Sequence, residues 1–314
     1  MLFQSRVLHV AKDLGFADEY EDAFCVSDER GAAAIADGVS SAVFSGQWSR
    51  IVTEALIHQT PDLHDAAAFR QWLKDIRATW LSQIDLPRLP PNLQAKLRQV
   101  GGAFCTLLWL DLQSLQEPAD GRFRLKAYAL GDTSLFHVRN ATLLRSFPMT
   151  YSAEFDADPM SLCSVDWNRD QNLEFKSLEV DCEIGDLVVL ATDAVAKWIL
   201  ATIEAGGAVD WNSYLSVDES AWIAEIEALR SELRMRRDDS TLILLSIGQP
   251  AVVPAVREPG LDVAVADDPV GEQAVAIGDR MESAPFTVEE VAESRNMELP
   301  HQEIAVPDPK SFAE

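Results

Sequence analysis

The feature that most constrains the fold of this chain is a series of short, strongly apolar runs that end at acidic residues. Residues 32–36, Ala-Ala-Ala-Ile-Ala, lead into Asp37-Gly38, and residues 187–191, Leu-Val-Val-Leu-Ala, lead into Thr192-Asp193. Runs of this length, bounded by turn-forming residues, are typical of buried β-strands. They are clustered along the chain and do not alternate regularly with helices, which favours antiparallel sheets over a parallel βαβ arrangement.

Hydrophobic periodicity predicts the other elements. The predicted strands are Ala23–Asp28, Ala32–Ala36, Phe104–Asp111, Arg122–Ala129, Ser134–Arg139, Leu173–Glu179, Asp186–Ala191 and Thr241–Ile247. The predicted helices are Gly46–His58, Ala66–Ile84, Asn92–Gln99, Ala194–Ile203 and Ser220–Arg234. Short connections at 27–31 and 130–133 favour hairpins, and hence antiparallel pairing. We expect an α+β fold, a four-layer α-β-β-α sandwich of two antiparallel sheets flanked by helices.

Composition divides the chain near residue 250. From Ala251 to Glu314 there are 14 acidic and 4 basic residues, seven prolines and few aromatic residues. Such a stretch buries too little apolar surface to offset the entropy of ordering it. We therefore expect a folded domain at 1–249 and an acidic, Pro-containing, mostly disordered tail at 250–314.

The formal net charge of −25 excludes several classes of partner. Phosphate backbones and anionic membrane surfaces would be repelled, so neither nucleic acid nor membrane is an expected partner. The N-terminus lacks the pattern of a signal peptide, and no run approaches the length of a membrane span. The histidines show no ligand spacing, which argues against a zinc site. These features predict a cytoplasmic protein, which we expect to be a monomer.

The acidic turns are the candidate functional residues. Taken singly, each has a structural explanation: Glu21-Asp22 as edge charges, Asp37-Gly38 as a turn, and Thr192-Asp193 as a helix N-cap. Asp132 and Asp238-Asp239 could likewise be charged turns. Taken together, acids at the ends of apolar strands supply the oxygen ligands that Mg²⁺ and Mn²⁺ prefer. Two such ions can activate a water for phosphoester hydrolysis.

The order and spacing of these motifs resemble the type 2C metal-dependent protein serine/threonine phosphatases, especially bacterial members. The resemblance extends from Gly15 to about Ile247. Its motifs are Glu21-Asp22-Ala23-Phe24, Ile35-Ala36-Asp37-Gly38, Gly101-Gly102-Ala103-Phe104-Cys105-Thr106, Ala129-Leu130-Gly131-Asp132-Thr133, residues 185–193 and Asp238-Asp239-Ser240-Thr241-Leu242-Ile243. Each motif is degenerate, but six in the family's order form a specific signal.

The resemblance implies a site of two Mn²⁺ or Mg²⁺ ions, with a weaker third. Asp37 would bridge the two ions and hold the nucleophilic water, as the catalytic residue. Glu21 and the Gly38 carbonyl would complete one ion's ligands, and Asp193 and Asp238 those of the other. Asp132 would lie at the third ion, while Asp22 and Asp239 would support the ligands. The implied partners are a phosphoprotein substrate and a cognate Ser/Thr kinase.

Three positions depart from the family's pattern. Ala17 and Val39 stand where members often have a phosphate-binding Arg and a general-acid His, and Ala194 stands where many have Gly. Lys12 or Arg50 could bind phosphate in place of the Arg, although the ammonium of a lysine cannot reproduce a bidentate fork. Two alternatives therefore remain open. One is a non-catalytic phosphatase-like module that binds a regulatory partner such as a kinase; the other is a phosphatase of small phosphoesters.

Overall fold

The structure, a computed structural model, describes residues 2–115, 121–165 and 173–248. All described residues belong to one compact unit. The predicted domain boundary and the predicted tail at 250–314 lie outside the described residues. Within those residues, no helix combines the length and the apolar character needed to cross a membrane.

The first sheet brings together strands from both ends of the described chain. Its order is β1 (Phe3–Val10), β11 (Ser240–Ile247), β10 (Leu187–Ala191), β6 (Ser134–Arg139) and β7 (Thr142–Phe147). Each strand pairs antiparallel with its neighbours. The central strand β10 is buried along its whole length, which explains its unbroken apolar run.

The second sheet contains five of the eight predicted strands. Its order is β2 (Ala23–Ser27), β3 (Ala32–Gly38), β4 (Phe104–Ser114), β5 (Arg122–Leu130) and β9 (Lys176–Glu183), and the short β8 (Leu162–Cys163) pairs with β4. These pairs are also antiparallel. Residues 32–36 of β3 are buried on both faces of the sheet.

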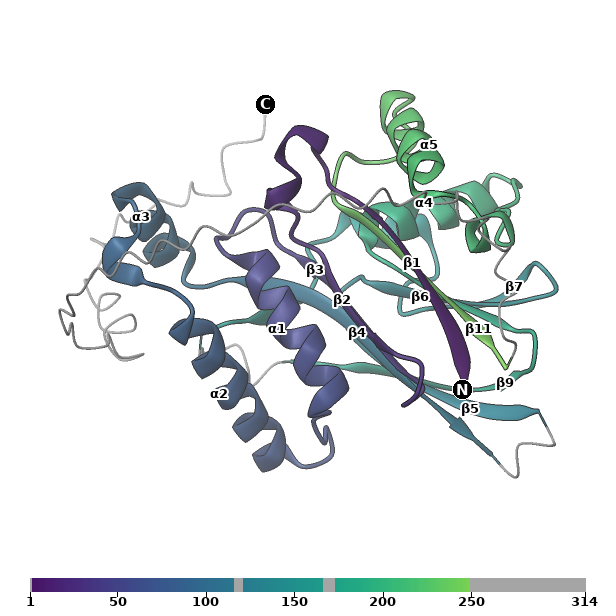
Figure 1. The fold of residues 1–314 in the computed structure, drawn as a ribbon, viewed down its shortest axis with the longest axis horizontal. Coiled ribbons are helices and arrows are strands. Elements are labelled where there is room, and N and C mark those ends of the chain that lie inside the picture. Colours follow the sequence, from purple (N-terminus) through teal and green to yellow (C-terminus); the bar gives the residue numbers. More distant parts are fainter. Residues whose placement is uncertain (1, 116–120, 166–172, 249–314) are drawn as a thin grey trace, which may run out of the picture. The chain divides into compact units, whose positions relative to one another are not determined.

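Helices cover the outer face of each sheet, as Figure 1 shows. On the second sheet lies α1 (Ser45–His58), and α2 (Ala66–Ser82) packs against α1. These two helices and α3 (Pro91–Val100) share a core with β3 and β4. On the first sheet lie α4 (Asp193–Glu204) and α5 (Glu219–Ser231), packed on β1, β6, β10 and β11. Short 3₁₀ helices are η1 (Leu14–Glu19), η2 (Leu86–Arg88), η4 (Ser152–Asp156) and η6 (Ser213–Leu215).

A third core fills the space between the two sheets. Ile35 of β3 and Leu108 of β4 face Val188 of β10 and Ile243 of β11, and all four side chains are fully buried. Because the sheets bury apolar side chains against each other and against the helices, the molecule has four layers in the order α-β-β-α. The predicted fold class is therefore confirmed, and the five predicted helices match α1 to α5 to within three residues at either end.

The strand predictions differ from the structure at four strands. The sequence analysis missed β1, β7 and β8, and it placed β9 at Leu173–Glu179 where the structure has Lys176–Glu183. β1 and β7 are the edge strands of the first sheet, and their residues alternate poorly between buried and exposed. β9 is an edge strand too, mostly exposed, so its sequence carries little apolar signal.

The connection at 130–133 is not the predicted hairpin. It leaves β5 in the second sheet and enters β6 in the first, so it crosses between the layers. Gly131 has a φ of +92°, and a Cβ there would lie 2.6 Å from the Cβ of Thr106. Only glycine meets both constraints. The crossover places the next residue, Asp132, at the end of the sandwich where β3 and β10 also end.

Candidate metal centre

The acidic turns predicted from sequence converge at one end of the sandwich. Asp37 is the penultimate residue of β3, Asp193 begins α4 two residues after the end of β10, and Asp238 lies in the turn before β11. The carboxylates close enough to disfavour ionisation of Asp37 are those of Asp193, Asp22, Asp132 and Asp238. Five chain segments thus deliver five carboxylates to one place.

Burial and mutual repulsion make these carboxylates hard to ionise. Burial first, and then the neighbouring carboxylates, raise the pKa of Asp37 well above its usual value. Burial and the charge of Asp193 raise the pKa of Asp132 to about 7. Burial also raises the pKa of Asp193, although the nearby Arg236 acts in the opposite direction. A bound cation would offset both the repulsion and the lost hydration.

Unpartnered oxygen atoms test whether these residues fit a metal ion. Oδ1 of Asp22 and Oδ1 of Asp193 are buried and have no hydrogen-bond partner among the described residues. Whole-residue exposure is 3% for Asp22 and 8% for Asp193. Buried polar atoms are nearly always satisfied in native proteins, so such orphans need an explanation. Hard oxygen ligands that lack a partner fit Mg²⁺ or Mn²⁺.

Asp22 connects the two sheets. Its Oδ2 accepts hydrogen bonds from the Thr192 hydroxyl at 3.0 Å and from the Thr241 hydroxyl at 2.6 Å. Thr192 in turn accepts from the Thr241 amide at 3.0 Å. The Thr192 side chain makes no capping bond to α4, although Thr192 is its N-cap residue. Asp22 and the two threonines therefore fix the ends of β10 and β11 against the start of β2.

Asp239 holds the segment that carries Glu21. Its carboxylate accepts from the Lys12 amide at 2.7 Å and from the Glu21 amide at 2.6 Å. The Glu21 carboxylate accepts from Lys12 Nζ at 2.7 Å and from the hydroxyl of Ser40. The structure thus places Lys12, the predicted phosphate ligand, in an ion pair with Glu21.

Gly38 lies against the backbone of the Glu21 segment. A Cβ at this position would be 2.6 Å from the Glu21 carbonyl oxygen and 3.0 Å from the Cβ atoms of Glu21 and Ser45. Real Cβ atoms do not approach backbone this closely, so the position requires glycine for space. The close approach brings the main chain after Asp37 beside Glu21, as the predicted ligand set requires.

Two arginines at the site carry roles that the sequence analysis did not assign. Arg236 Nη2 donates to both Asp193 and Asp238, the latter at 2.8 Å. Arg230 is buried and donates to the Ala11 carbonyl at 2.9 Å, to Glu227, and to the Asp238 carbonyl. The only sequence signal for either was the basic run that precedes Asp238. Arg230 fixes the turn that presents Asp238, whereas Arg236 contacts the carboxylates themselves.

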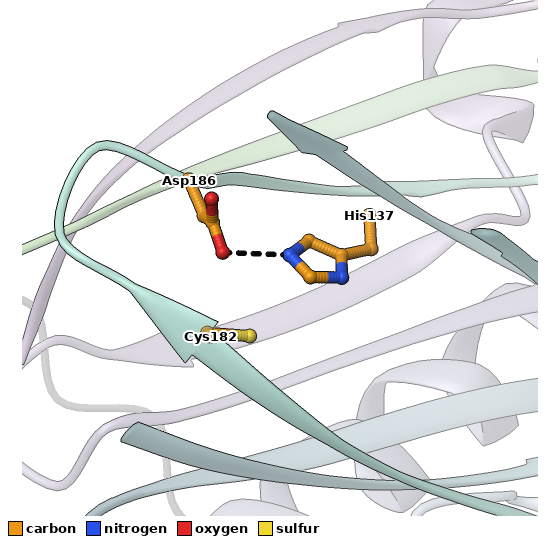
Figure 2. Close-up of side chains that lie close together, drawn as sticks. All are labelled: His137, Cys182 and Asp186. Atoms are coloured by element: carbon orange, nitrogen blue, oxygen red, sulfur yellow. Dashed lines mark hydrogen bonds and ion pairs between the residues drawn. The ribbon is translucent and has the colours of Figure 1, made fainter. Parts of the chain in front are cut away.

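A second cluster of potential ligands lies at the opposite end of β10, at the start of the 185–193 motif, where no ligand had been predicted. One ligand atom from each of His137, Cys182 and Asp186 lies within 4.8 Å of the others, and all three residues are buried (Figure 2). Asp186 already accepts hydrogen bonds from His137 at 2.7 Å and from Arg139 at 2.6 and 2.8 Å. Burial, followed by the charge of Asp186, raises the pKa of the Cys182 thiol to about 12. Since an arginine already neutralises Asp186 and the thiol stays protonated, this cluster does not need a metal.

Comparison with known proteins identifies the family. Residues 9–242 match the family model described as protein phosphatase 2C. No curated protein sequence matches the chain. Since this family model covers most of the chain, the protein belongs to the protein phosphatase 2C family. The family suspected from sequence is therefore confirmed. Membership of this family supports a phosphatase function and the use of divalent metal.

Solved structures similar to this one are distant in sequence. PppA, a regulatory component of T6SS in Pseudomonas aeruginosa, is 18% identical with a TM-score of 0.49, and the match covers 79% of this chain and 98% of PppA. The photosystem II phosphatase PBCP is 16% identical with a TM-score of 0.48, covering 78% and 98%. The catalytic domain of the serine/threonine protein phosphatase PstP, solved with two manganese ions, has the same four values.

Proposed function

We propose that the protein is a metal-dependent phosphatase that hydrolyses phosphoserine or phosphothreonine in proteins. The observation that carries this proposal is the convergence of five buried or half-buried aspartates, two of which have an oxygen atom without a partner. Family membership supplies the reaction class. Two Mn²⁺ or Mg²⁺ ions bound there would activate water and neutralise charge on the phosphoryl group.

The proposed ligand set follows the predicted motifs. Asp37 would bridge the two ions. Glu21 and the Gly38 carbonyl would serve one side of the site, and Asp193 and Asp238 the other. Asp132, whose crossover connection ends beside Asp193, would hold the weaker third ion. The chemistry that supports this set is an all-oxygen donor group whose mutual repulsion a bound cation would relieve.

The chain's own residues would fix this arrangement before substrate arrives. Asp22 holds the ends of β10 and β11, and Asp239 holds the Glu21 segment through its amides. Such support keeps ligands within the narrow tolerance that metal chemistry requires. Lys12, which lies beside Glu21, is the proposed contact for the substrate phosphate. A phosphoprotein, and a kinase that makes it, are the proposed partners.

The test is phosphate release from a phosphothreonine peptide, measured with Mn²⁺ and then with EDTA. The proposal expects release that requires Mn²⁺ and stops when EDTA removes the metal. Small phosphoesters provide the comparison, because a phosphatase dedicated to them would hydrolyse them and leave the peptide intact. Release that continues unchanged in EDTA would contradict the proposal.

A second candidate function is a non-catalytic module that binds a regulatory partner such as a kinase. The observation that favours it is the presence of Ala17 and Val39, neither of which can bind phosphate through a side chain or transfer a proton. Folded protein that binds Mn²⁺ yet hydrolyses neither the peptide nor small phosphoesters would favour this function over the first.

A further inference from the structure

Arg236 contacts the same two carboxylates that the proposed function assigns to one metal ion. Its Nη2 atom donates to Oδ2 of Asp193 and, at 2.8 Å, to Oδ2 of Asp238. One nitrogen therefore lies between two proposed ligands. A divalent cation that bound both oxygen atoms would have to take the place of this nitrogen.

The environment of Arg236 allows it to move away. Its side chain is about half exposed, at 54%, whereas Asp193 is almost fully buried. Arg230, six residues earlier, is buried and fixed by backbone carbonyls at Ala11 and Asp238. The turn that presents Asp238 would thus keep its shape when the Arg236 side chain leaves.

Electrostatics make the competition substantial. The guanidinium charge favours ionisation of Asp193 and opposes the raised pKa that burial causes. A guanidinium is always protonated at physiological pH, so its charge cannot be lost by titration. At separations of a few ångströms, a unit positive charge near a divalent ion costs the ion about tenfold in affinity or more.

We propose that Arg236 is a built-in counter-ion that competes with the divalent cation for Asp193 and Asp238 and thereby sets the cation affinity of this side of the site. The inference rests on the proposed function, because it takes these carboxylates to be metal ligands. It adds a residue that determines metal affinity without being a ligand. Mn²⁺ binding at Asp193 and Asp238 requires the guanidinium to swing into solvent.

The test is calorimetric titration of Mn²⁺ into the EDTA-treated full chain and its Arg236→Gln variant, with no substrate present. Removing the competing charge should tighten Mn²⁺ binding about tenfold. Arg236→Lys keeps a positive charge and should stay within about threefold of the original affinity. Arg234→Gln is the matched control: Arg234 lies in the same turn, is 55% exposed, and pairs with Glu232. The Mn²⁺ affinity of the Arg234→Gln variant should equal that of the original protein.

A second readout separates competition from a general effect on folding. Without Mn²⁺, Arg236→Gln should unfold at a lower temperature than the original protein, because the aspartates lose their counter-ion. At saturating Mn²⁺ this difference should disappear. Unchanged or weaker Mn²⁺ binding in Arg236→Gln would overturn the inference while leaving the proposed function intact. If the original protein binds no Mn²⁺, both the metal centre and this inference fail.

Discussion

The two ends of strand β10 both bury aspartate, with opposite electrostatic results. At the start of the strand, Asp186 accepts hydrogen bonds from Arg139, from the Glu183 amide and from His137. Burial alone would raise its pKa, but these donors prevail and lower it. At the other end, burial and neighbouring carboxylates raise the pKa of Asp37 and of Asp132.

This difference distinguishes a carboxylate that the chain's own donors neutralise from the carboxylates that we propose bind metal. Asp186 is neutralised by the chain's own donors, and replacing it would leave those donors unpaired. The carboxylates around Asp37 face one another. Among the described residues, Arg236 pairs only with Asp193 and Asp238, and Lys12 forms an ion pair only with Glu21. A short distance between ligand-type atoms is therefore a weaker indicator of a metal site than charge that the protein leaves unbalanced.

The largest expected effect is on catalysis. Asp37→Asn should reduce Mn²⁺-dependent hydrolysis of a phosphothreonine peptide by about 1,000-fold, because it removes the proposed bridging ligand and with it several kcal/mol of transition-state stabilisation. Asp186→Asn serves as the control at the other end of β10, and its rate, corrected for folded protein, should change less than about twofold. Equal losses in the two variants would show that the comparison is wrong.

The next largest effect is on stability. Here the substitution at the Asp186 end of β10 should be the damaging one, and the substitution at the other end should not. Asp186→Asn should lower the free energy of unfolding by about 3 kcal/mol, because it leaves the Arg139 charge and His137 without their buried partner. Asp132→Asn should instead stabilise the EDTA-treated protein at pH 7.5, since it removes one member of a repelling group. Urea unfolding of both variants measures the two changes in the free energy of unfolding. A lower value for Asp132→Asn than for the original protein would contradict the account.

A smaller effect is expected from Asp239, which supports the site without being a proposed ligand. Asp239→Asn weakens its bonds to the Lys12 and Glu21 amides. Mn²⁺ affinity, measured by calorimetry, should fall about tenfold, as is usual for residues that orient ligands. Asp218→Asn is a suitable control, because Asp218 caps α5, a different element, and also accepts from a main-chain amide. If Asp239→Asn binds Mn²⁺ as tightly as the control, Asp239 does not position the metal ligands.

The mildest test is the dependence of stability on pH. The pKa of Asp132 is about 7 in the folded protein and ~3.9 in an unfolded chain. Between these values the folded state binds more protons, so the stability of EDTA-treated protein should fall as pH rises from about 4 to 7. Asp186, with its lowered pKa, should contribute stability that is lost only as pH falls below about 4. At saturating Mn²⁺, stability should instead rise with pH over this range. Thermal unfolding measured from pH 5 to 8 checks both trends, and a stability of the EDTA-treated protein that does not fall with rising pH would contradict the account.

Sequence reasoning predicted the fold best where burial dictates composition. β3 and β10 are buried on both faces, so their apolar runs were unmistakable, and the amphipathic helices followed from their period. The edge strands β1 and β7 are not predicted from the sequence, because half-exposed strands tolerate polar residues and so lack a clear apolar pattern. The crossover at Gly131 was taken for a hairpin, because turn chemistry alone does not tell which sheet the next strand joins.

The candidate site was partly predictable for a related reason. Acids directly after apolar strands signalled Asp37 and Asp193, and the motif order supplied the others. Arg236 could not be assigned from its position in a basic run, since the side chain's direction depends on how the turn before β11 folds. The same holds for His137 and Asp186, which are 49 residues apart and meet only through the pairing of β6 with β10.

The most direct test of the central claim is a Mn²⁺ titration of the EDTA-treated protein beside its Asp37→Asn and Asp186→Asn variants. The account predicts that the original protein and Asp186→Asn bind Mn²⁺ with the same stoichiometry and similar affinity, and that Asp37→Asn loses most of this binding. Binding that survives in Asp37→Asn and disappears in Asp186→Asn would place the metal at the opposite end of β10 and contradict the account.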